Sequence, residues 1–304
     1  MPPITPTQPV KMGKFATSLA IVRQSWAILK QDKEIMLFPV VSAITTGVAL
    51  CIMGLIYVFA ILGVSLSDIG TLPPEQAATS AWHYLVLLGY YIILCFIIYF
   101  FEACIFIIAH ARMSGQDLSF MDGVRGSLHR VGAIFIWSCI SATVGVLLRA
   151  IADRSELIGK IVAFLFGAAW NLLTYFSLPL IVVGNMSVAG SFKESATMIR
   201  KTWGETIIGN VGVGLVSSHL ILLGFLASIG AVVLAGDVRV AIGVGVVFVL
   251  YVVILSIVFS SLSAIFKMAL YEYARTGTPP QGFSPELVAR AMTSKTTVPL
   301  VSQQ

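Results

Sequence analysis

Glu102 and Lys267 are the residues of this 304-residue chain whose type and position suggest chemistry. Each borders or enters a long apolar stretch, Glu102 ten residues before Arg112 and Lys267 eight residues before Arg275. A charged group is costly in hydrocarbon, so such residues usually pair or mark a route for ions or substrates. We therefore predict an ion pair between Glu102 and Lys267. Two alternatives stay open: Lys267 extends to the membrane surface, while Glu102 bonds a hydroxyl or stays protonated.

Two further polar residues belong to this candidate site. Steps of four and then three residues back from Lys267 lead to Ser260, so the two share one helix face. Asn171 lies in another apolar stretch, eight residues before Pro179. Proline frees the carbonyl four residues earlier and predicts a kink, and broken helices can line substrate sites. Glu102, Lys267, Asn171 and Ser260 are therefore the candidate intramembrane polar site, although a kink packed by small residues would have no such role.

The sequence shows no pattern typical of catalysis, cofactor binding or metal binding. The four cysteines lie in apolar stretches without C-x-x-C spacing. His219 has no His, Cys or acidic residue at ligand spacing. Metalloprotease, hydrolase and nucleotide-binding patterns are absent, and the glycines between residues 206 and 236 fit none of them. We predict a non-enzymatic protein with no catalytic residue, cofactor or metal; an intramembrane enzyme is a third alternative.

The elements that must position the polar residues are six apolar stretches. A helix needs about 20 apolar residues to cross a hydrocarbon core of about 30 Å. Only 11% of the residues are charged, 58% are hydrophobic and the mean hydropathy is +0.94, far from the composition of soluble proteins. We predict an all-α fold, a polytopic transmembrane helix bundle with six spans. The stretches without Asp, Glu, Lys or Arg are 35–67, 76–101, 131–148, 161–192, 206–236 and 240–266.

Charge between the spans predicts how the chain is oriented. Fifteen Lys and Arg residues fall in the amino-terminal segment, the second and fourth connections and the tail, against four in the other three connections. Positive residues stay in the cytoplasm, so both termini are expected there in a multi-pass protein of the inner (plasma) membrane. The net charge of +5 comes from residues beside the spans. It therefore predicts no nucleic-acid partner.

A repeated pattern divides the membrane domain into three units. Phe15 and Trp26 recur as Phe192 and Trp203 at a constant offset of 177 residues, and a looser copy begins at Phe120. We expect each copy to be a helix lying flat in the cytoplasmic interface, followed by two spans, with Phe15, Trp26, Phe192 and Trp203 as interfacial anchors. The three units cover about residues 13–110, 117–188 and 190–275.

Apolar residues in each copy recur at steps of about four and three, which predicts one apolar face on a helix. The predicted faces are Phe15, Leu19, Val22, Trp26 and Leu29; Phe120, Val124, Leu128 and Val131; and Phe192, Ala196, Ile199 and Trp203.

The ends of the chain differ in composition from the membrane domain, which we place at residues 13–278. Residues 1–12 are rich in Pro and Thr and are expected to be flexible. Residues 279–304 form a predicted cytoplasmic tail that is partly disordered, from Lys295 onward.

Several local patterns resemble those of an uncharacterised prokaryotic family of six-span membrane proteins. They include Ser25, Trp26, Leu29, Lys30, Asp32, Lys33, Glu34, Phe38 and Pro39; Ala169, Trp170, Leu178 and Pro179; Ser195, Thr202, Trp203, Gly204 and Glu205; and Leu270, Tyr271, Tyr273, Ala274 and Gly277. The resemblance implies a bacterial or archaeal inner-membrane protein and no known activity. The layout is also similar to the membrane region beside some glycerophosphodiester phosphodiesterase domains, but this chain lacks their catalytic domain. Likeness of fold does not transfer function.

Our leading interpretation is a non-enzymatic membrane protein that organises lipid or protein partners. The basic surface helices would face the bilayer and its anionic lipids. The alternative is a small-solute transporter or channel that uses Glu102 and Lys267. The sequence identifies no particular protein partner and leaves self-association open.

Overall fold

A computed structural model describes residues 14–57, 59, 81–153, 157–202 and 212–285. Every regular element within these ranges is a helix, which confirms the all-α prediction. Residues 1–12 and 286–304, with their predicted flexibility, lie outside the described residues. The elements are α1 Lys14–Gln31, the short 3₁₀ helix η1 Lys33–Met36, α2 Leu37–Ile56, α3 Ala81–Met113, α4 Phe120–His129, α5 Val131–Asp153, α6 Ile158–Leu173, α7 Ser177–Val182, α8 Val188–Thr202, α9 Gly212–Ala235 and α10 Val238–Thr276.

Within the described residues, six helical segments are long and apolar enough to cross a bilayer, the number that was predicted. Three of them continue further than the charge-free stretches, since α3 runs through Glu102 to Met113, α5 through Arg149 to Asp153, and α10 through Lys267 to Thr276. A single charged side chain does not interrupt helical hydrogen bonding, so charge alone places these helix ends too early. The segments are Lys33–Ile56, Leu85–Met113, Val131–Asp153, Ile158–Val182, Val216–Ala235 and Val238–Thr276.

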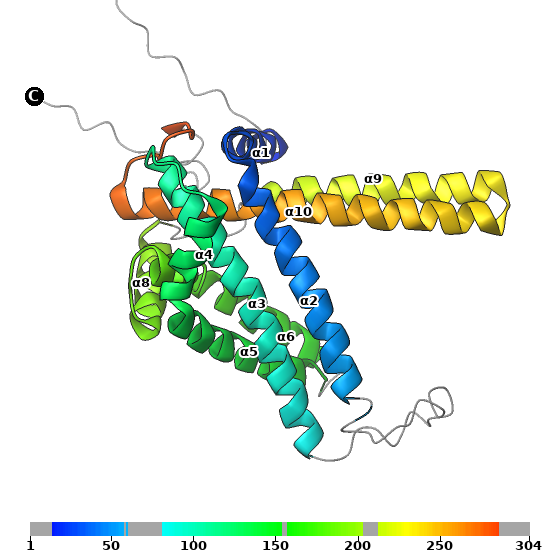
Figure 1. Cartoon of the computed structure of the whole chain (residues 1–304), viewed down its shortest axis with the longest axis horizontal. Coiled ribbons are helices and arrows are strands. Elements are labelled where there is room, and N and C mark those ends of the chain that lie inside the picture. Colours follow the sequence, from blue (N-terminus) through cyan, green and yellow to red (C-terminus); the bar gives the residue numbers. More distant parts are fainter. Residues whose placement is uncertain (1–13, 58, 60–80, 154–156, 203–211, 286–304) are drawn as a thin grey trace, which may run out of the picture.

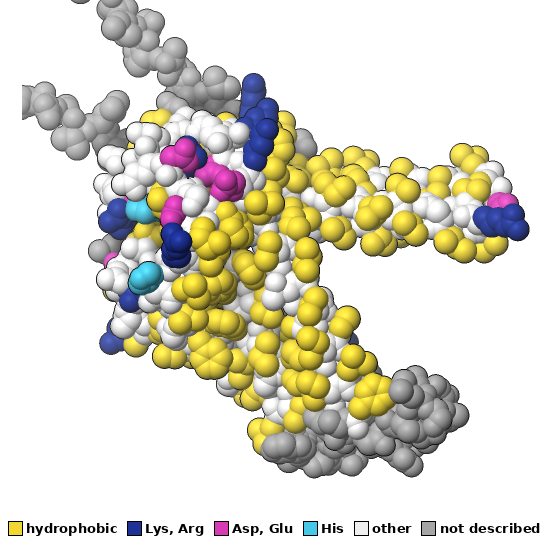
Figure 2. Space-filling view, in the orientation of Figure 1, with side chains coloured by type: hydrophobic (Ala, Val, Ile, Leu, Met, Phe, Trp, Pro, Cys, Tyr) yellow, Lys and Arg dark blue, Asp and Glu magenta, His cyan; other side chains and the backbone are white. Residues whose placement is uncertain are grey.

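One helix that is not a candidate span precedes two candidate spans three times, as predicted: α1 before α2 and α3, α4 before α5 and the span of α6 and α7, and α8 before α9 and α10 (Figure 1). Charged side chains gather at the end of the molecule where α1 and α4 lie (Figure 2). We call this region the polar end; its residues include Asp32, Glu34, Arg112, Asp122 and Glu272.

The predicted apolar face of α1 is divided between the protein and its surroundings. Leu19 and Trp26 of that face are exposed, whereas Leu29 is buried together with Ile21, Ser25 and Ile28. The reason is that α1 carries two apolar faces: one packs on the protein, and the one with Leu19 and Trp26 is left for the surroundings. That outward face is the one suited to a membrane interface.

Small residues allow the short helices to pack closely. In α4 the buried residues are Gly123 and Ser127. A Cβ at Gly123 would come within 2.9 Å of Ile108 of α3, so only glycine permits this contact without rearrangement. Similarly, α8 buries Ser191 and Ser195. Apolar periodicity favours the large side chains, and it therefore misses the faces that make the contact.

The buried core lies near the polar end, where α3 and α10 pack together. Ala103, Phe106 and Ile108 of α3 and Ile265 and Leu270 of α10 are fully buried there. In the third unit, α9 and the first half of α10 form a hairpin that projects away from this core (Figure 1). The long α10 therefore joins the packed core to a hairpin whose apolar side chains are mostly exposed.

The projecting hairpin is held together along its own length. The Tyr251 hydroxyl of α10 donates a 2.8 Å hydrogen bond to the carbonyl oxygen of Leu220 in α9. A Cβ at Gly224 would lie only 2.4 Å from the Tyr251 ring. The small residues of this span thus permit close helix contact, as small-xxx-small spacing does in membranes.

The beginning of the tail packs on α1. The Ser284 amide donates to Gln24 Oε1 at 3.2 Å, and Gln24 Nε2 donates to Ser284 Oγ at 3.1 Å. Phe283 is buried beside Phe266 of α10, with 6.3 Å between the ring centroids. The tail is therefore fixed to the polar end as far as residue 285.

Candidate functional site

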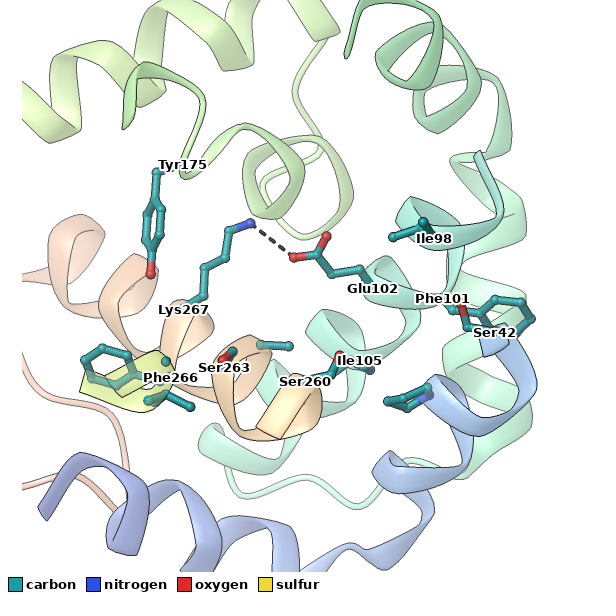
Figure 3. A pocket seen from close by; sticks show the side chains of 14 residues that line it. Ser42, Ile98, Phe101, Glu102, Ile105, Tyr175, Ser260, Ser263, Phe266 and Lys267 are labelled. Carbon is teal, nitrogen blue, oxygen red and sulfur yellow. Dashed lines mark hydrogen bonds and ion pairs between the residues drawn. The ribbon is translucent and has the colours of Figure 1, made fainter. Parts of the chain in front are cut away.

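Glu102 and Lys267 form the predicted ion pair. Lys267 Nζ of α10 donates to Glu102 Oε1 of α3 over 3.1 Å, and the two side chains point toward each other across the gap between their helices (Figure 3). Their side chains are 21% exposed for Lys267 and 26% exposed for Glu102. Both charges thus lie beside the buried core while still reaching open space.

The open space is a cavity of about 400 Å³. Its lining comes from α2, α3, α9 and α10 and from the turn between α6 and α7. The volume falls within the range of small-molecule sites, about 300 to 1,000 Å³. Apolar side chains such as Ile98 and Phe101 surround the ion pair, as in ligand sites where a few polar groups fix orientation (Figure 3).

Two aromatic rings lie beside the lysine. Lys267 Nζ is 5.2 Å from the ring centroid of Phe106 and 5.4 Å from that of Tyr175. A cation within about 6 Å of an aromatic face is attracted by the ring quadrupole. The ammonium therefore has favourable neighbours in addition to the Glu102 carboxylate.

A break in the fourth span brings Tyr175 to the cavity. The helix α6 ends at Leu173 and α7 begins at Ser177, so the interruption falls where Pro179 cannot donate to the Tyr175 carbonyl. The Phe176 amide left by the break donates to Ser195 Oγ of α8 over 3.0 Å. The predicted kink is confirmed, and the buried hydroxyl that satisfies it is one that sequence reasoning missed.

The other two predicted members of the polar site behave differently. Ser260 lines the cavity together with Ser263 and Ser42, so one helix face of α10 does contribute to the site (Figure 3). Asn171 is exposed on α6 and is not part of the cavity lining. The kink explains the difference, because the turn that follows α6 points Tyr175, rather than Asn171, toward Lys267.

The predicted interfacial anchors are described only in part. Trp26 is 36% exposed, and Lys30 Nζ lies 5.9 Å from its ring centroid. Phe192 stacks on Trp170 of α6 with 5.9 Å between ring centroids, so it also docks α8 on the second unit. The side chain of Phe15 and the whole of Trp203 lie outside the described residues.

At the polar end, the segment around η1 makes contacts with α3 and with α4 that the sequence did not predict. Arg112 of α3 pairs with Asp32, 3.2 Å away, and with Asp117. The Phe120 amide at the start of α4 donates to Glu34 Oε2 over 2.6 Å. A carboxylate at a helix N-terminus satisfies a free amide and favours the helix dipole. These contacts therefore fix α4 in place and need no catalytic role.

A capping box also begins α4. The Ser119 hydroxyl and amide both donate to Asp122 Oδ2, at 2.6 and 3.1 Å, and the Asp122 amide donates to Ser119 Oγ. The Ser119 hydroxyl, followed by its amide, lowers the pKa of the Asp122 carboxyl below its usual value. The carboxylate is thus the form that holds the first turn of α4.

A third contact joins α3 to α10 closer to the polar end than the cavity. His110 Nδ1 lies 2.9 Å from Glu272 Oε1, and Arg275 donates to the other oxygen of the same carboxylate over 3.1 Å. Among the described side chains, the pair Glu102–Lys267 is therefore one of two contacts between ionisable groups of these helices. Of the two, it is the one that lines the cavity.

No group of three or more His, Cys, Asp or Glu side chains in the described part of the chain could hold a metal ion. The cavity lining includes one carboxylate, one ammonium, three serine hydroxyls and the phenol of Tyr175. This donor set can bind complementary charges and orient a polar ligand.

The model of a family of unknown function (DUF6159) matches residues 81–282, more than half of the chain. The matched part includes both charged residues of the cavity. Neither the curated proteins nor the solved structures contain a match to this chain.

Proposed function

The chain belongs to the DUF6159 family, whose function is unknown, and we propose that it is a non-enzymatic integral membrane protein that binds lipid, with the headgroup in the cavity at Glu102 and Lys267. The observation that carries the proposal is a charged pair exposed to a cavity between apolar helices. In a bilayer, the molecules that bring a polar group to such a place attached to apolar chains are lipids.

The surroundings of the cavity support lipid as the occupant. Beyond the cavity, α2 and the α9–α10 hairpin diverge (Figure 1). Ile44 of α2 and Ile254 of α10 are exposed on these diverging parts, and apolar side chains cover much of the visible surface of both (Figure 2). A headgroup held by the ion pair would therefore have apolar helix surface nearby for its acyl chains.

Lipid binding should depend on both charges of the cavity. The double variant Glu102→Gln with Lys267→Met removes them together, so it leaves no unpaired charge beside the core. The measurement is lipid retained per protein after purification in mild detergent, read by native mass spectrometry. We expect at least a tenfold loss of tightly retained lipid in the double variant. The matched control is Lys160→Met, at an exposed lysine of α6, which should retain as much as the unmodified protein.

Equal lipid retention by the double variant and the unmodified protein would contradict the proposal. The folded state of each variant is checked by its thermal unfolding midpoint. A double variant that unfolds at the normal temperature yet loses lipid supports a binding role rather than general damage.

One observation favours a second function, a small-solute transporter or channel. The cavity combines the two charges with the hydroxyls of Ser42, Ser260 and Ser263, which is more polar surface than helix packing requires. Proteoliposomes can test this alternative by uptake of labelled glycine and by potassium and proton flux. Rates equal to those of protein-free liposomes would remove it, whereas uptake abolished by Lys267→Met would favour it over lipid binding.

The proposal includes the predicted location, an inner membrane with both termini in the cytoplasm and the basic surface helices near anionic lipid. The excess of Lys and Arg on one set of connections supports this orientation. Labelling of single cysteines introduced at residues 5 and 300, after the four native cysteines are replaced by serine, tests it in intact cells and in inverted vesicles. The likeness in layout to membrane regions beside phosphodiesterase domains stays a prediction.

A further inference from the structure

We infer that the cavity selects a zwitterionic ligand, one that carries a primary ammonium for Glu102 and a phosphate or carboxylate anion for Lys267. The inference rests on the proposed function and names the chemical class of its ligand. Phosphatidylethanolamine is the lipid source of this chemistry, and glycerophosphoethanolamine is a free source of the same groups.

The argument begins with the charges that a ligand must replace. The 3.1 Å contact between Lys267 and Glu102 satisfies both residues when the cavity holds no ligand. An anion that binds Lys267 displaces Glu102 and leaves a carboxylate unpaired beside the core. Leaving one buried partner of an ion pair uncompensated is strongly unfavourable. A zwitterion avoids this loss, because it exchanges one internal ion pair for two pairs with the ligand.

The geometry allows the pair to open without movement of the helices. Glu102 and Lys267 belong to different helices, and both are partly exposed to the cavity. The long lysine side chain can rotate while its ammonium stays near the rings of Phe106 and Tyr175, which already lie within 5.4 Å. These rings stabilise the cation during the exchange. The carboxylate of Glu102 then faces the space that Lys267 leaves.

The aromatic rings also distinguish between ammonium types. Quaternary ammonium groups are usually bound in cages of free aromatic faces. Here the Phe106 and Tyr175 rings are already in contact with Lys267, so they do not offer an empty cage. A primary ammonium instead donates hydrogen bonds to a carboxylate, which a choline headgroup cannot do. The cavity therefore fits ethanolamine better than choline.

Serine hydroxyls supply the remaining polar contacts. Ser260 and Ser263 lie on the face of α10 that leads to Lys267, and Ser42 of α2 lines the same cavity (Figure 3). A hydroxyl can donate to a phosphate oxygen and accept from an ammonium, so the same residues serve either end of a zwitterion. They add no charge that would favour a purely anionic ligand.

The test is a headgroup series with constant acyl chains. The unmodified protein is placed in nanodiscs that contain phosphatidylethanolamine, phosphatidylcholine or phosphatidylglycerol in equal amounts, and the lipid retained after detergent extraction is measured by mass spectrometry. We expect phosphatidylethanolamine to exceed each of the others at least tenfold. Titration with glycerophosphoethanolamine, monitored by calorimetry, separates the lipid from the free compound as the source of the ligand. Saturable binding of the free compound would show that the acyl chains are not needed.

Variants of the two charges sharpen the test. Glu102→Gln frees Lys267 and should reverse the preference toward phosphatidylglycerol. The charge exchange Glu102→Lys with Lys267→Glu keeps one charge of each sign and should keep the preference for phosphatidylethanolamine. Lys160→Met is the control and should match the unmodified protein.

The outcomes separate the inference from the function beneath it. Equal retention of the three lipids by the unmodified protein overturns the zwitterion inference and leaves lipid binding intact. If no retained lipid depends on Glu102 and Lys267, both the zwitterion inference and the proposed lipid binding are overturned. Preferential retention of phosphatidylglycerol by the unmodified protein also overturns the inference, since Lys267 alone would then select the ligand. If a variant fails to fold, the headgroup series on the unmodified protein still decides.

Discussion

The two halves of α10 belong to one continuous helix and have opposite surroundings. Between Phe259 and Glu272 most side chains are buried against α3 and its neighbours. Between Val238 and Ile254 the same helix lies beside α9 in the projecting hairpin (Figure 1), and large residues such as Val247 are mostly exposed. The comparison teaches that hydrophobicity identifies a span, whereas the pattern of small and polar residues decides which part of it packs on protein.

The residues that differ between the halves show how this happens. The buried half contains Ser261, Ala264 and Ala269, which let neighbouring helices approach. The projecting half is rich in Val, Leu and Ile, whose large surfaces suit lipid. Apolar side chains gain little from association within hydrocarbon, so packing in membranes depends on close contact and polar groups. Lys267 stands in the buried half, where its partner is available.

The strongest test of the comparison removes equal side chains from the two halves. Ile265→Ala deletes a fully buried side chain, while Ile254→Ala deletes one that is 60% exposed. We expect the first to lower the free energy of unfolding by about 2 to 4 kcal/mol, because a buried Ile→Ala change leaves a cavity. The second should change it by less than about 0.5 kcal/mol, as at ordinary surface sites. Denaturant titration in micelles or nanodiscs measures both.

Similar losses at the two positions would break the comparison. That result would mean that the projecting half is covered by protein, for example by a second copy of the chain. Sedimentation of the protein in detergent would then show a dimer, and Ile254→Ala would shift it toward the monomer.

The next largest effect concerns the charged pair that involves Lys267 of the buried half. Lys267→Met leaves Glu102 unpaired and should destabilise the protein by about 2 kcal/mol, less than for a fully buried pair because both side chains reach the cavity. Adding Glu102→Gln should recover most of that loss. The double-mutant cycle, measured by denaturant titration, isolates the coupling between the two residues. Additive losses would show that the charges do not interact in the folded protein.

The parts of this structure that sequence could predict are those set by composition and by lone charges. Glu102 and Lys267 could be paired in advance because few ionisable residues lie so deep in apolar stretches. The kink before Pro179 followed from a missing amide, whatever its surroundings. The order of three short helices, each before two long ones, followed from the repeat that includes Phe15 and Phe192.

The parts that could not be predicted depend on contacts between distant segments. Ser195 satisfies the Phe176 amide only because α8 lies against the break. The expected kink at Pro179 predicts that Asn171 belongs to the polar site, but the turn after α6 directs Tyr175 into the cavity instead. The buried faces of α1 and α4 consist partly of Ser and Gly, which apolar periodicity does not count.

A smaller effect is expected inside the projecting hairpin. Gly224→Ala places a Cβ 2.4 Å from the Tyr251 ring, whereas Gly230→Ala, on the same helix, meets no atom within 4 Å. We expect Gly224→Ala to cost about 1 to 2 kcal/mol, since overpacking forces side chains or backbone to move. Gly230→Ala should be neutral or stabilising by up to about 1 kcal/mol because alanine favours helix. Denaturant titration compares the two variants.

Spin labels placed on α9 and α10 near the tip of the hairpin report the geometry of the same variants. The distance between the labels should increase in Gly224→Ala and stay constant in Gly230→Ala. An unchanged distance and stability in Gly224→Ala would mean that the Tyr251 ring moves freely, and that the helices are held together by their surroundings instead of by this contact.

The smallest expected effect is a pH dependence of amide hydrogen exchange, which we expect at the polar end and not in the hairpin. The pKa of Asp122 is lowered in the folded protein, chiefly by the Ser119 hydroxyl. The contribution of the Asp122 carboxylate to stability is therefore complete above its pKa in the unfolded chain, and it is lost as pH falls through its pKa in the folded protein. Hydrogen exchange at the first amides of α4, corrected for intrinsic rates, should accelerate below about pH 4. Amides in the middle of α9 should not respond.

Asp122→Asn separates this local effect from general acid unfolding. The variant keeps the side-chain shape but cannot lose a proton, so exchange in α4 should no longer vary with pH in this range. Its exchange at neutral pH should resemble that of the unmodified protein at low pH, because the charged acceptor of the capping box is missing in both. If Asp122→Asn kept the full pH dependence, the capping box would not be its source. The start of α4 would then be held by the contact between the Phe120 amide and Glu34, which joins two repeat units, rather than by the cap within one.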